Sequence, residues 1–278
     1  MTSTVLGKYL TLSDGAKLYY KELGQGYPII LIHGWPCSNE FFRKNIEELA
    51  KTHRVITPDL RGYGNSSKIL SGHTMIQYGK DIAELISQLK LSKVHLAGWS
   101  MGGSIVLSYW QQFSKDQKLA SLALIDSDPY PFSKEDWNPH GLRVGQADGL
   151  NAMFQTYQAD PAAFFQGFVG KMFKSGQATE DDMAWMKAEM LKTPPIIAMA
   201  AYSDFAISDY EKVVPTVTVP FLVIGADSGV YPQGEQLAHH LAARAPKGYA
   251  EVFKDGGHLL FYEQPEKFNS LYLNFITK

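Results

Sequence analysis

The hydrophobic positions divide the chain into short apolar runs separated by amphipathic stretches. The run IILI at 29–32 shows no alternation, which is typical of a strand covered on both faces in a parallel sheet. Apolar residues at Ile82, Leu85, Ile86 and Leu89 recur at helical spacing and predict a helix over 74–90. Strand and helix then alternate. Further strands are predicted at 9–12, 17–23, 54–58, 94–98, 119–126, 220–225 and 250–253, and further helices at 40–51, 101–111, 234–245 and from 265 onwards.

The alternation stops for one long stretch in the second half of the chain. Between 129 and 212 Met, Phe, Trp and Tyr stand among polar residues, and Pro and Gly break the stretch into short predicted helices. A strand–helix pattern that is interrupted once and then completed predicts one α/β sheet with an inserted cap. We expect a core formed by residues 1–128 and 213–278 and a helical cap formed by residues 129–212.

Composition and charge restrict the expected cellular compartment and the classes of binding partner. The chain has 278 residues, 45% of them hydrophobic, which suffices for a large core. Its 26 basic and 28 acidic residues are interleaved, so we expect no nucleic-acid or membrane partner and favour a small-molecule substrate. One cysteine, Cys37, cannot form an internal disulfide, and the beginning MTSTVLGKYL lacks the regions of a secretory signal. We expect a cytoplasmic setting, and the oligomeric state stays open.

The segment LAGWSMGG, 96–103, carries the strongest chemical signal. Gly98, Ser100 and Gly102 have the spacing G-x-S-x-G between a predicted strand and a predicted helix. Glycines on both sides let neighbouring chain approach a tight turn without Cβ clashes. Ser100 would then stand at a helix N-terminus, where free N–H groups favour a developing negative charge. Ser100 is therefore the predicted nucleophile.

A serine nucleophile needs a base and two oxyanion donors. His258 follows the last predicted strand, on the same carboxyl edge of the sheet as Ser100, and is the predicted base. His33 is the other candidate by position, but within HGWP it favours a role in shaping the loop. The donors would be the N–H group after the nucleophile, that of Met101, and one from the loop after an earlier strand, that of Trp35.

Four segments resemble the α/β-hydrolase superfamily, in its lidded serine esterase, perhydrolase and lactonase-like branch. They are GQGYPIILIHGWPCSNEFF, RVITPDLRGYGNSS, VHLAGWSMGGSIVLSYW and FKDGGHLLFYEQPEKF, in the order in which the family has them. The resemblance implies a mostly parallel sheet of about eight strands with helices on both faces, a Ser-His-acid triad, and neither cofactor nor metal. It also implies that Asp59, Arg61 and Gly64 brace a loop without chemistry.

The resemblance leaves three carboxylates as candidates for the acid. In most of the superfamily the acid follows the strand after the cap, but here Ser228 occupies that position and Asp227 stands one residue early. Some relatives place the acid at the end of the strand that follows the nucleophile helix, where this chain reads LALIDSDP. We favour Asp126, with Asp227 as the fallback and Asp128 as the remaining candidate.

These residues predict a carboxylic ester hydrolase that acts on small to medium apolar esters or lactones through an acyl-enzyme. The residues expected to line the substrate pocket are His33, Gly34, Tyr130, Phe154, Phe165, Trp185, Tyr231 and Leu259. A cofactor-free perhydrolase or haloperoxidase-like enzyme is the alternative, because peroxide can replace water in the second step. A hydrolase-fold ligand receptor with little turnover, a lyase of the hydroxynitrile type and a peptidase remain open as well.

Overall fold

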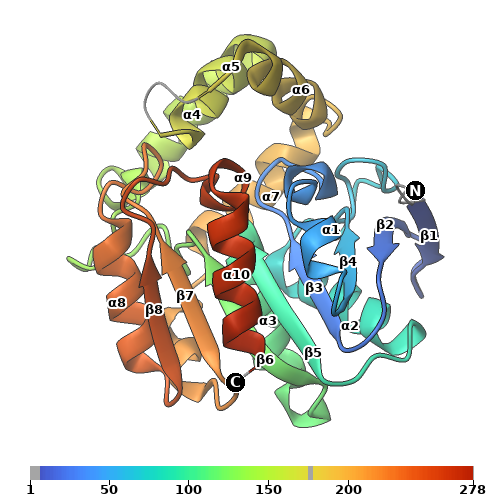
Figure 1. Cartoon of the computed structure of the whole chain (residues 1–278). Coiled ribbons are helices and arrows are strands. Elements are labelled where there is room, and N and C mark those ends of the chain that lie inside the picture. The colour runs from blue at the N-terminus through green and yellow to red at the C-terminus, as the bar shows by residue number, and fades with distance from the viewer. Residues whose placement is uncertain (1–6, 175–177, 278) are drawn as a thin grey trace.

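The computed structural model describes residues 7–174 and 178–277, which form one eight-stranded sheet with helices around it (Figure 1). The first six residues, part of the predicted core, lie outside the described residues. The strand order is β1-β2-β4-β3-β5-β6-β7-β8, antiparallel only where β2 pairs with β1 and β4. The mostly parallel α/β prediction is confirmed. The strands are β1 Gly7–Thr11, β2 Lys17–Leu23, β3 Pro28–Ile32, β4 Arg54–Pro58, β5 Val94–Trp99, β6 Leu119–Ile125, β7 Phe221–Gly225 and β8 Gly248–Val252.

Helices cover both faces of this sheet. In Figure 1, α10 lies in front of the strands and α3 behind them. The α-helices of the core are α1 Ile46–Leu49, α2 Met75–Gln88, α3 Met101–Phe113, α8 Gly234–Arg244, α9 Leu260–Glu263 and α10 Pro265–Ile276, with 3-10 turns η1 Asn39–Phe42, η2 Ser114–Asp116 and η4 Glu211–Thr216.

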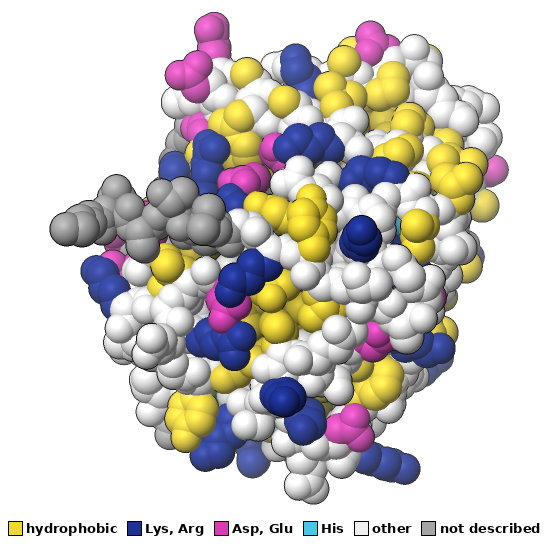
Figure 2. Space-filling model, turned by 90° about the vertical axis from the view of Figure 1, so that its right-hand side faces the viewer, with side chains coloured by type: hydrophobic (Ala, Val, Ile, Leu, Met, Phe, Trp, Pro, Cys, Tyr) yellow, Lys and Arg dark blue, Asp and Glu magenta, His cyan; other side chains and the backbone are white. Residues whose placement is uncertain are grey.

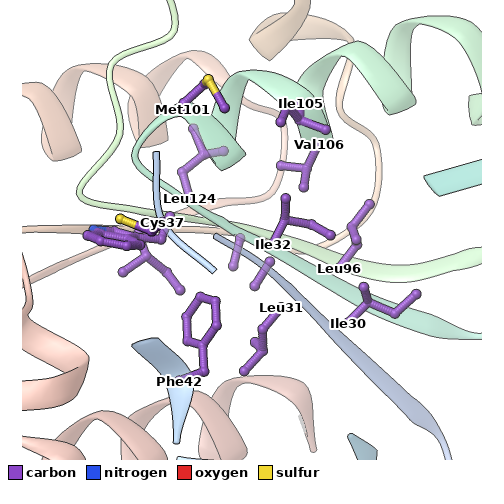
Figure 3. Close-up of a cluster of buried hydrophobic side chains, with 14 of the residues drawn as sticks. Ile30, Leu31, Ile32, Cys37, Phe42, Leu96, Met101, Ile105, Val106 and Leu124 are labelled. Atoms are coloured by element: carbon purple, nitrogen blue, oxygen red, sulfur yellow. The ribbon is translucent and has the colours of Figure 1, made fainter. Parts of the chain in front are cut away.

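The core of the sheet explains why its central strands lack alternation. All five residues of β3 are buried, because side chains of one strand meet helices on both faces. Figure 3 shows Leu31 and Phe42 on one side of this strand, and Ile105 and Val106 of α3 on the other. The sheet is thereby held between two apolar layers, and the carboxyl ends of β5, β6 and β7 are fixed at one edge.

One predicted helix is wrong in extent. Residues 40–51 form the 3-10 turn η1 and the single turn α1 instead of one helix. Asn39 donates its backbone and side-chain N–H groups to Asp59 at 2.7 and 2.6 Å, and the Asn45 amide donates to the Phe261 carbonyl at 2.8 Å. These distant hydrogen bonds fix the backbone at both residues and override the local preference for a continuous helix.

The segment between β6 and β7 contains a further set of helices, which lies above the carboxyl edge of the sheet (Figure 1). Its elements are η3 Gly141–Arg143, α4 Gln146–Ala159, α5 Pro161–Met172, α6 Glu180–Met190 and α7 Pro195–Ile207. Asp160 and Thr179 are the N-caps of α5 and α6, and their side chains accept hydrogen bonds from the Ala163 and Asp182 backbone N–H groups.

The surface carries charges of both signs. On the face shown in Figure 2, basic and acidic side chains lie scattered among neutral and hydrophobic ones. No helix within the described ranges is both long and apolar enough to cross a bilayer.

Candidate active site

The turn between β5 and α3 has the geometry of a nucleophile elbow. Ser100 lies at φ 55° and ψ −128°, a backbone conformation that L-residues rarely adopt and that stores strain. A Cβ on Gly98 would lie 2.1 Å from the Gly102 carbonyl oxygen, and one on Gly102 would lie 2.5 Å from that of Ile32. Both positions therefore require glycine. The turn leaves Ser100 partly exposed at the first turn of α3.

His258 and Asp126 form the closest contact between candidate catalytic residues. The imidazole Nδ1 lies 2.6 Å from the Asp126 carboxylate Oδ2, and both side chains are buried. Trp99, the residue before the elbow serine, donates its indole N–H to the His258 carbonyl at 2.9 Å. This bond attaches the histidine loop to the residue that precedes Ser100. The imidazole itself is oriented by the Asp126 carboxylate.

Asp126 is held by the loop that follows β7. The Ala226 backbone N–H donates to Asp126 Oδ1 at 3.1 Å, and the Ser228 hydroxyl donates to Oδ2 at 3.2 Å. Ser228 also accepts from the Tyr231 N–H at 2.9 Å. Ser228, in the loop after β7, thus donates a hydrogen bond to the carboxylate that follows the neighbouring strand β6.

The other two carboxylates have different surroundings. Asp227, the fallback acid, is exposed and accepts from the Glu235 backbone N–H at 3.1 Å near the start of α8. Asp128 is fully buried and accepts from the Tyr130 N–H at 2.9 Å. Burial raises the pKa of Asp128 to about 7. The structure brings Asp126 to His258, and it places Asp227 at a helix end instead.

The loop after β3 lies directly against the nucleophile. A Cβ on Gly34 would lie 2.8 Å from the Ser100 Cβ, so Gly34 allows this approach. His33 does not face a pocket: its Nδ1 lies 2.8 Å from the Gly34 carbonyl oxygen and its Nε2 accepts from the Leu60 N–H at 3.0 Å. Burial lowers the pKa of His33 to about 4, which keeps this ring neutral. Met101 is the first residue of α3, directly after Ser100, and Trp35 follows the glycine that contacts Ser100.

Trp35 also joins this loop to the inserted helices. Its indole N–H donates to the Ala198 carbonyl of α7 at 2.7 Å. Its ring packs on Tyr202 with centroids 4.7 Å apart. Four more aromatic rings lie around the indole at centroid distances of 6.0 to 6.3 Å, those of Tyr157, Phe164, Phe165 and Phe168.

A hollow of about 490 Å³ lies between α4, α5 and the loop after β7. Its lining is largely apolar and includes Met153, Phe164 and Phe168. Its polar members are His140, Thr156, Lys171 and Tyr202. Tyr231 lies next to it, since its ring centroid is 5.7 Å from that of His140 and 5.3 Å from that of His258.

None of the eight residues predicted to line the pocket is among those that line this hollow. Tyr231 and Gly34 lie next to His258 and Ser100, as described above. Phe154 packs on Tyr202, and Phe165 is buried against Trp35, whereas helix neighbours of these residues line the hollow.

The other pocket residues lie elsewhere. Tyr130 lines a separate surface hollow, and Leu259 is buried with its N–H bonded to the Met172 carbonyl at 3.1 Å. Trp185 lies under the Arg43 guanidinium, 3.6 Å from the ring centroid. Helical spacing indicates the buried face of a helix, but it does not indicate which buried residue reaches a cavity. The predicted lining therefore differs from the observed one.

Several residues around the site were not singled out by the sequence. Trp99 and Tyr202 form hydrogen bonds, and His140 and Tyr202 line the hollow, yet each is ordinary within its own segment. Ser228 was named at the family's acid position, but its hydrogen bond to Asp126 was not predicted. Within the described ranges, no group of three or more His, Cys, Asp or Glu residues could hold a metal ion.

Comparison with known proteins identifies the family. The profile of the alpha/beta hydrolase fold matches residues 27–265, and the chain belongs to this family. An esterase of Exiguobacterium antarcticum has a similar structure, with a TM-score of 0.89 and 27% identity over 98% of this chain and 100% of that one.

Two relatives show the range of activities among similar sequences. A bifunctional esterase/perhydrolase of Acinetobacter calcoaceticus is 30% identical over 236 residues, 81% of this chain and 83% of the relative. A putative non-heme chloroperoxidase of a Synechocystis species is 27% identical over 261 residues, 93% of this chain and 94% of the relative.

Proposed function

We propose that the chain is a serine hydrolase that cleaves carboxylic esters or lactones through an acyl-enzyme. The observation that carries this proposal is the buried 2.6 Å contact between His258 and Asp126 beside a serine held in an elbow turn. A neutral imidazole with Nδ1–H bonded to a carboxylate presents an unprotonated Nε2, which is the state required of a general base.

The proposed reaction has two halves. Ser100 Oγ attacks the ester carbonyl while His258 Nε2 takes its proton, and the N–H groups of Trp35 and Met101 stabilise the oxyanion. The tetrahedral intermediate collapses to the acyl-enzyme, and the imidazolium returns the proton to the leaving alcohol. Water then attacks with His258 as base, and the acid is released with Ser100 regenerated.

Two features support a small to medium apolar substrate. The helices α4 to α7 would act as the cap, because aromatic residues of α4, α5 and α7 pack around Trp35 and the same three helices contribute to the lining of the hollow beside Tyr231. Its apolar lining fits an acyl chain or an alcohol of modest size. The partner is then a small molecule, and the reaction needs no cofactor.

Labelling and turnover together test the proposal. A fluorophosphonate probe should label the wild-type protein and leave Ser100→Ala unlabelled, and p-nitrophenyl butyrate should be hydrolysed only by the wild type. Labelling without turnover would favour the receptor alternative. The absence of both would refute the assignment of Ser100.

Perhydrolysis is a second candidate because one relative of 30% identity is a bifunctional esterase/perhydrolase. In this reaction hydrogen peroxide attacks the same acyl-enzyme and releases a peracid. The test is peracid formation from acetate ester and hydrogen peroxide, with Ser100→Ala as the control.

A further inference from the structure

The loop that carries His258 lies directly against the end of α5. The Leu259 backbone N–H donates to the Met172 carbonyl at 3.1 Å. On the other side of the histidine, a Cβ on Gly257 would lie 2.5 Å from the Lys174 backbone nitrogen and 2.6 Å from the Met172 carbonyl oxygen. Both neighbours of His258 in the chain are therefore in contact with the backbone at the end of this helix.

One carboxylate joins the two segments. Glu263, the last residue of α9, accepts the Gly257 backbone N–H at Oε2, 2.8 Å away, and the Lys174 backbone N–H at Oε1, 2.7 Å away. Each of its two oxygens thus holds one of the two segments. The proposed reaction assigns no part to this residue.

A carboxylate suits this position better than an amide does. An ionised carboxylate is an acceptor only, so both oxygens can accept at the same time. Burial raises the pKa of Glu263, and the hydrogen bonds from the Lys174 and Gly257 N–H groups oppose this rise because they favour the ionised form. An amide would keep one acceptor and turn its NH₂ group towards the other N–H donor.

The bonds of Glu263 add to two others that hold the histidine. The imidazole is bonded to Asp126 at 2.6 Å, and the His258 carbonyl accepts from the Trp99 indole at 2.9 Å. These two bonds fix the ring and the carbonyl side of the residue, whereas Glu263 fixes Gly257 on its amino side. A general base must be held closely, because a displacement of about 1 Å can cost a factor of about 100 in rate.

We propose that Glu263 is a positioning residue for the catalytic base: by joining Gly257 to the end of α5, it holds His258 in the place that proton transfer from Ser100 requires. This assignment rests on the proposed hydrolase function. It extends that function by making the end of α5 part of the support of the base. The same helix contributes Phe164 and Phe168 to the lining of the hollow, so one helix contacts both the hollow and the histidine loop.

The rate of labelling by a fluorophosphonate tests the positioning role. The probe reacts with Ser100 only as fast as the base removes the serine proton, so the rate constant depends on the position of His258. We expect Glu263→Ala to lower this rate constant by about 30- to 100-fold, and Glu263→Gln by about tenfold because the amide keeps one acceptor. The fraction of protein finally labelled should equal that of the wild type. With p-nitrophenyl butyrate, kcat should fall while KM changes little.

A second variant reaches the same contact from the other side. Gly257→Ala leaves Glu263 in place and puts a Cβ against the Lys174 nitrogen, so it should slow labelling as well. Glu266→Gln, which alters an exposed carboxylate at the start of α10, is the matched control and should label at the wild-type rate. Thermal melting shows which variants fold, and Glu263→Gln carries the test if Glu263→Ala does not.

The outcomes separate positioning from a purely structural role. Wild-type rate constants in the folded Glu263 and Gly257 variants overturn the positioning role and leave the hydrolase proposal intact. A lower melting temperature or labelled fraction with an unchanged rate constant shows that Glu263 only stabilises the fold, and it overturns the proposal too. A wild type that is neither labelled nor active on the ester overturns the proposed function itself.

Discussion

At the scale of single residues, the site depends on which carboxylate meets the histidine. Asp126 contacts His258 and receives two further hydrogen bonds from the loop after β7, whereas Asp227 faces solvent. Asp126 follows β6, one strand away from Ser228, which donates a hydrogen bond to it from the loop after β7.

We predict that Asp126→Asn lowers kcat for an aryl ester by about 10³- to 10⁴-fold, because an amide favours the wrong imidazole tautomer. Asp227→Asn is the matched control and should change kcat less than twofold, since Asp227 contacts only α8. Steady-state kinetics on both variants is the measurement. The reverse ranking would reassign the acid to the loop after β7.

Ser228→Ala should lower both the free energy of unfolding and kcat, each to a modest extent. It removes one donor to Asp126 and the acceptor of the Tyr231 N–H, so we expect a loss of about 1–2 kcal/mol in the free energy of unfolding. It should lower kcat far less than Asp126→Asn. Urea unfolding and kinetics measure both, with Ser203→Ala, whose hydroxyl bonds its own helix, as control. A kcat equal to that of Asp126→Asn would mean that Ser228 does more than hold the acid.

At the scale of elements, the elbow between β5 and α3 is the most constrained turn of the site. Gly98 faces a backbone carbonyl with no space for a side chain, and backbone cannot yield as a flexible side chain can. The strain at Ser100 is maintained by these close contacts on both sides of the turn.

Gly98→Ala should therefore lower the free energy of unfolding by roughly 3 kcal/mol or more, because its Cβ would overlap the Gly102 carbonyl. Gly170→Ala is the matched control. It lies on an exposed part of α5 with the nearest foreign atom 3.9 Å from the added Cβ, and it should stabilise the helix by about 0.5–1 kcal/mol. Thermal and urea unfolding compare the two, and equal stability would contradict the steric account.

The sequence predicted the elements of the core far better than those that depend on distant partners. The strands predicted from long apolar runs and the helices predicted from helical spacing are present, because both patterns depend only on local sequence. The helix predicted at 40–51 was interrupted by bonds from Asn39 and Asn45 to residues far along the chain. The short helix α9 was missed because its stability comes from tertiary packing, such as that of Phe261 on Phe42.

The same distinction applies to the site. Ser100 and His258 carry recognisable local sequence, so they could be named in advance. His140 and Tyr202 come from separate segments, and only the fold brings their side chains within 3.4 Å of each other.

At the scale of the whole molecule, buried ionisable groups link stability to pH. Burial lowers the pKa of His95 to about 4, with the charge of His53 adding to the effect. In the unfolded chain a histidine titrates near 6.5. Below that pH the unfolded state binds a proton that the folded state does not, so the stability contributed by a neutral His95 is present above pH 6.5 and is lost as the pH falls towards 4.

His95→Gln should therefore lose less stability than the wild type between pH 7.5 and pH 5, by up to about 2 kcal/mol. The measurement is urea unfolding at both pH values. Exposed His239→Gln is the control and should follow the wild type. If both variants lost stability equally, His95 would not be the group that titrates.

The position of Trp35 has a mechanical consequence. Its backbone N–H is a donor of the proposed oxyanion site, and its indole N–H donates to α7. Its ring packs against aromatic residues of α4, α5 and α7. Any displacement of these helices that carries the indole with it also shifts the amide that must meet the oxyanion. If these helices form the proposed cap, we expect a bulky substrate that displaces them to lower kcat more than it weakens binding, so that the rate of turnover depends on substrate size.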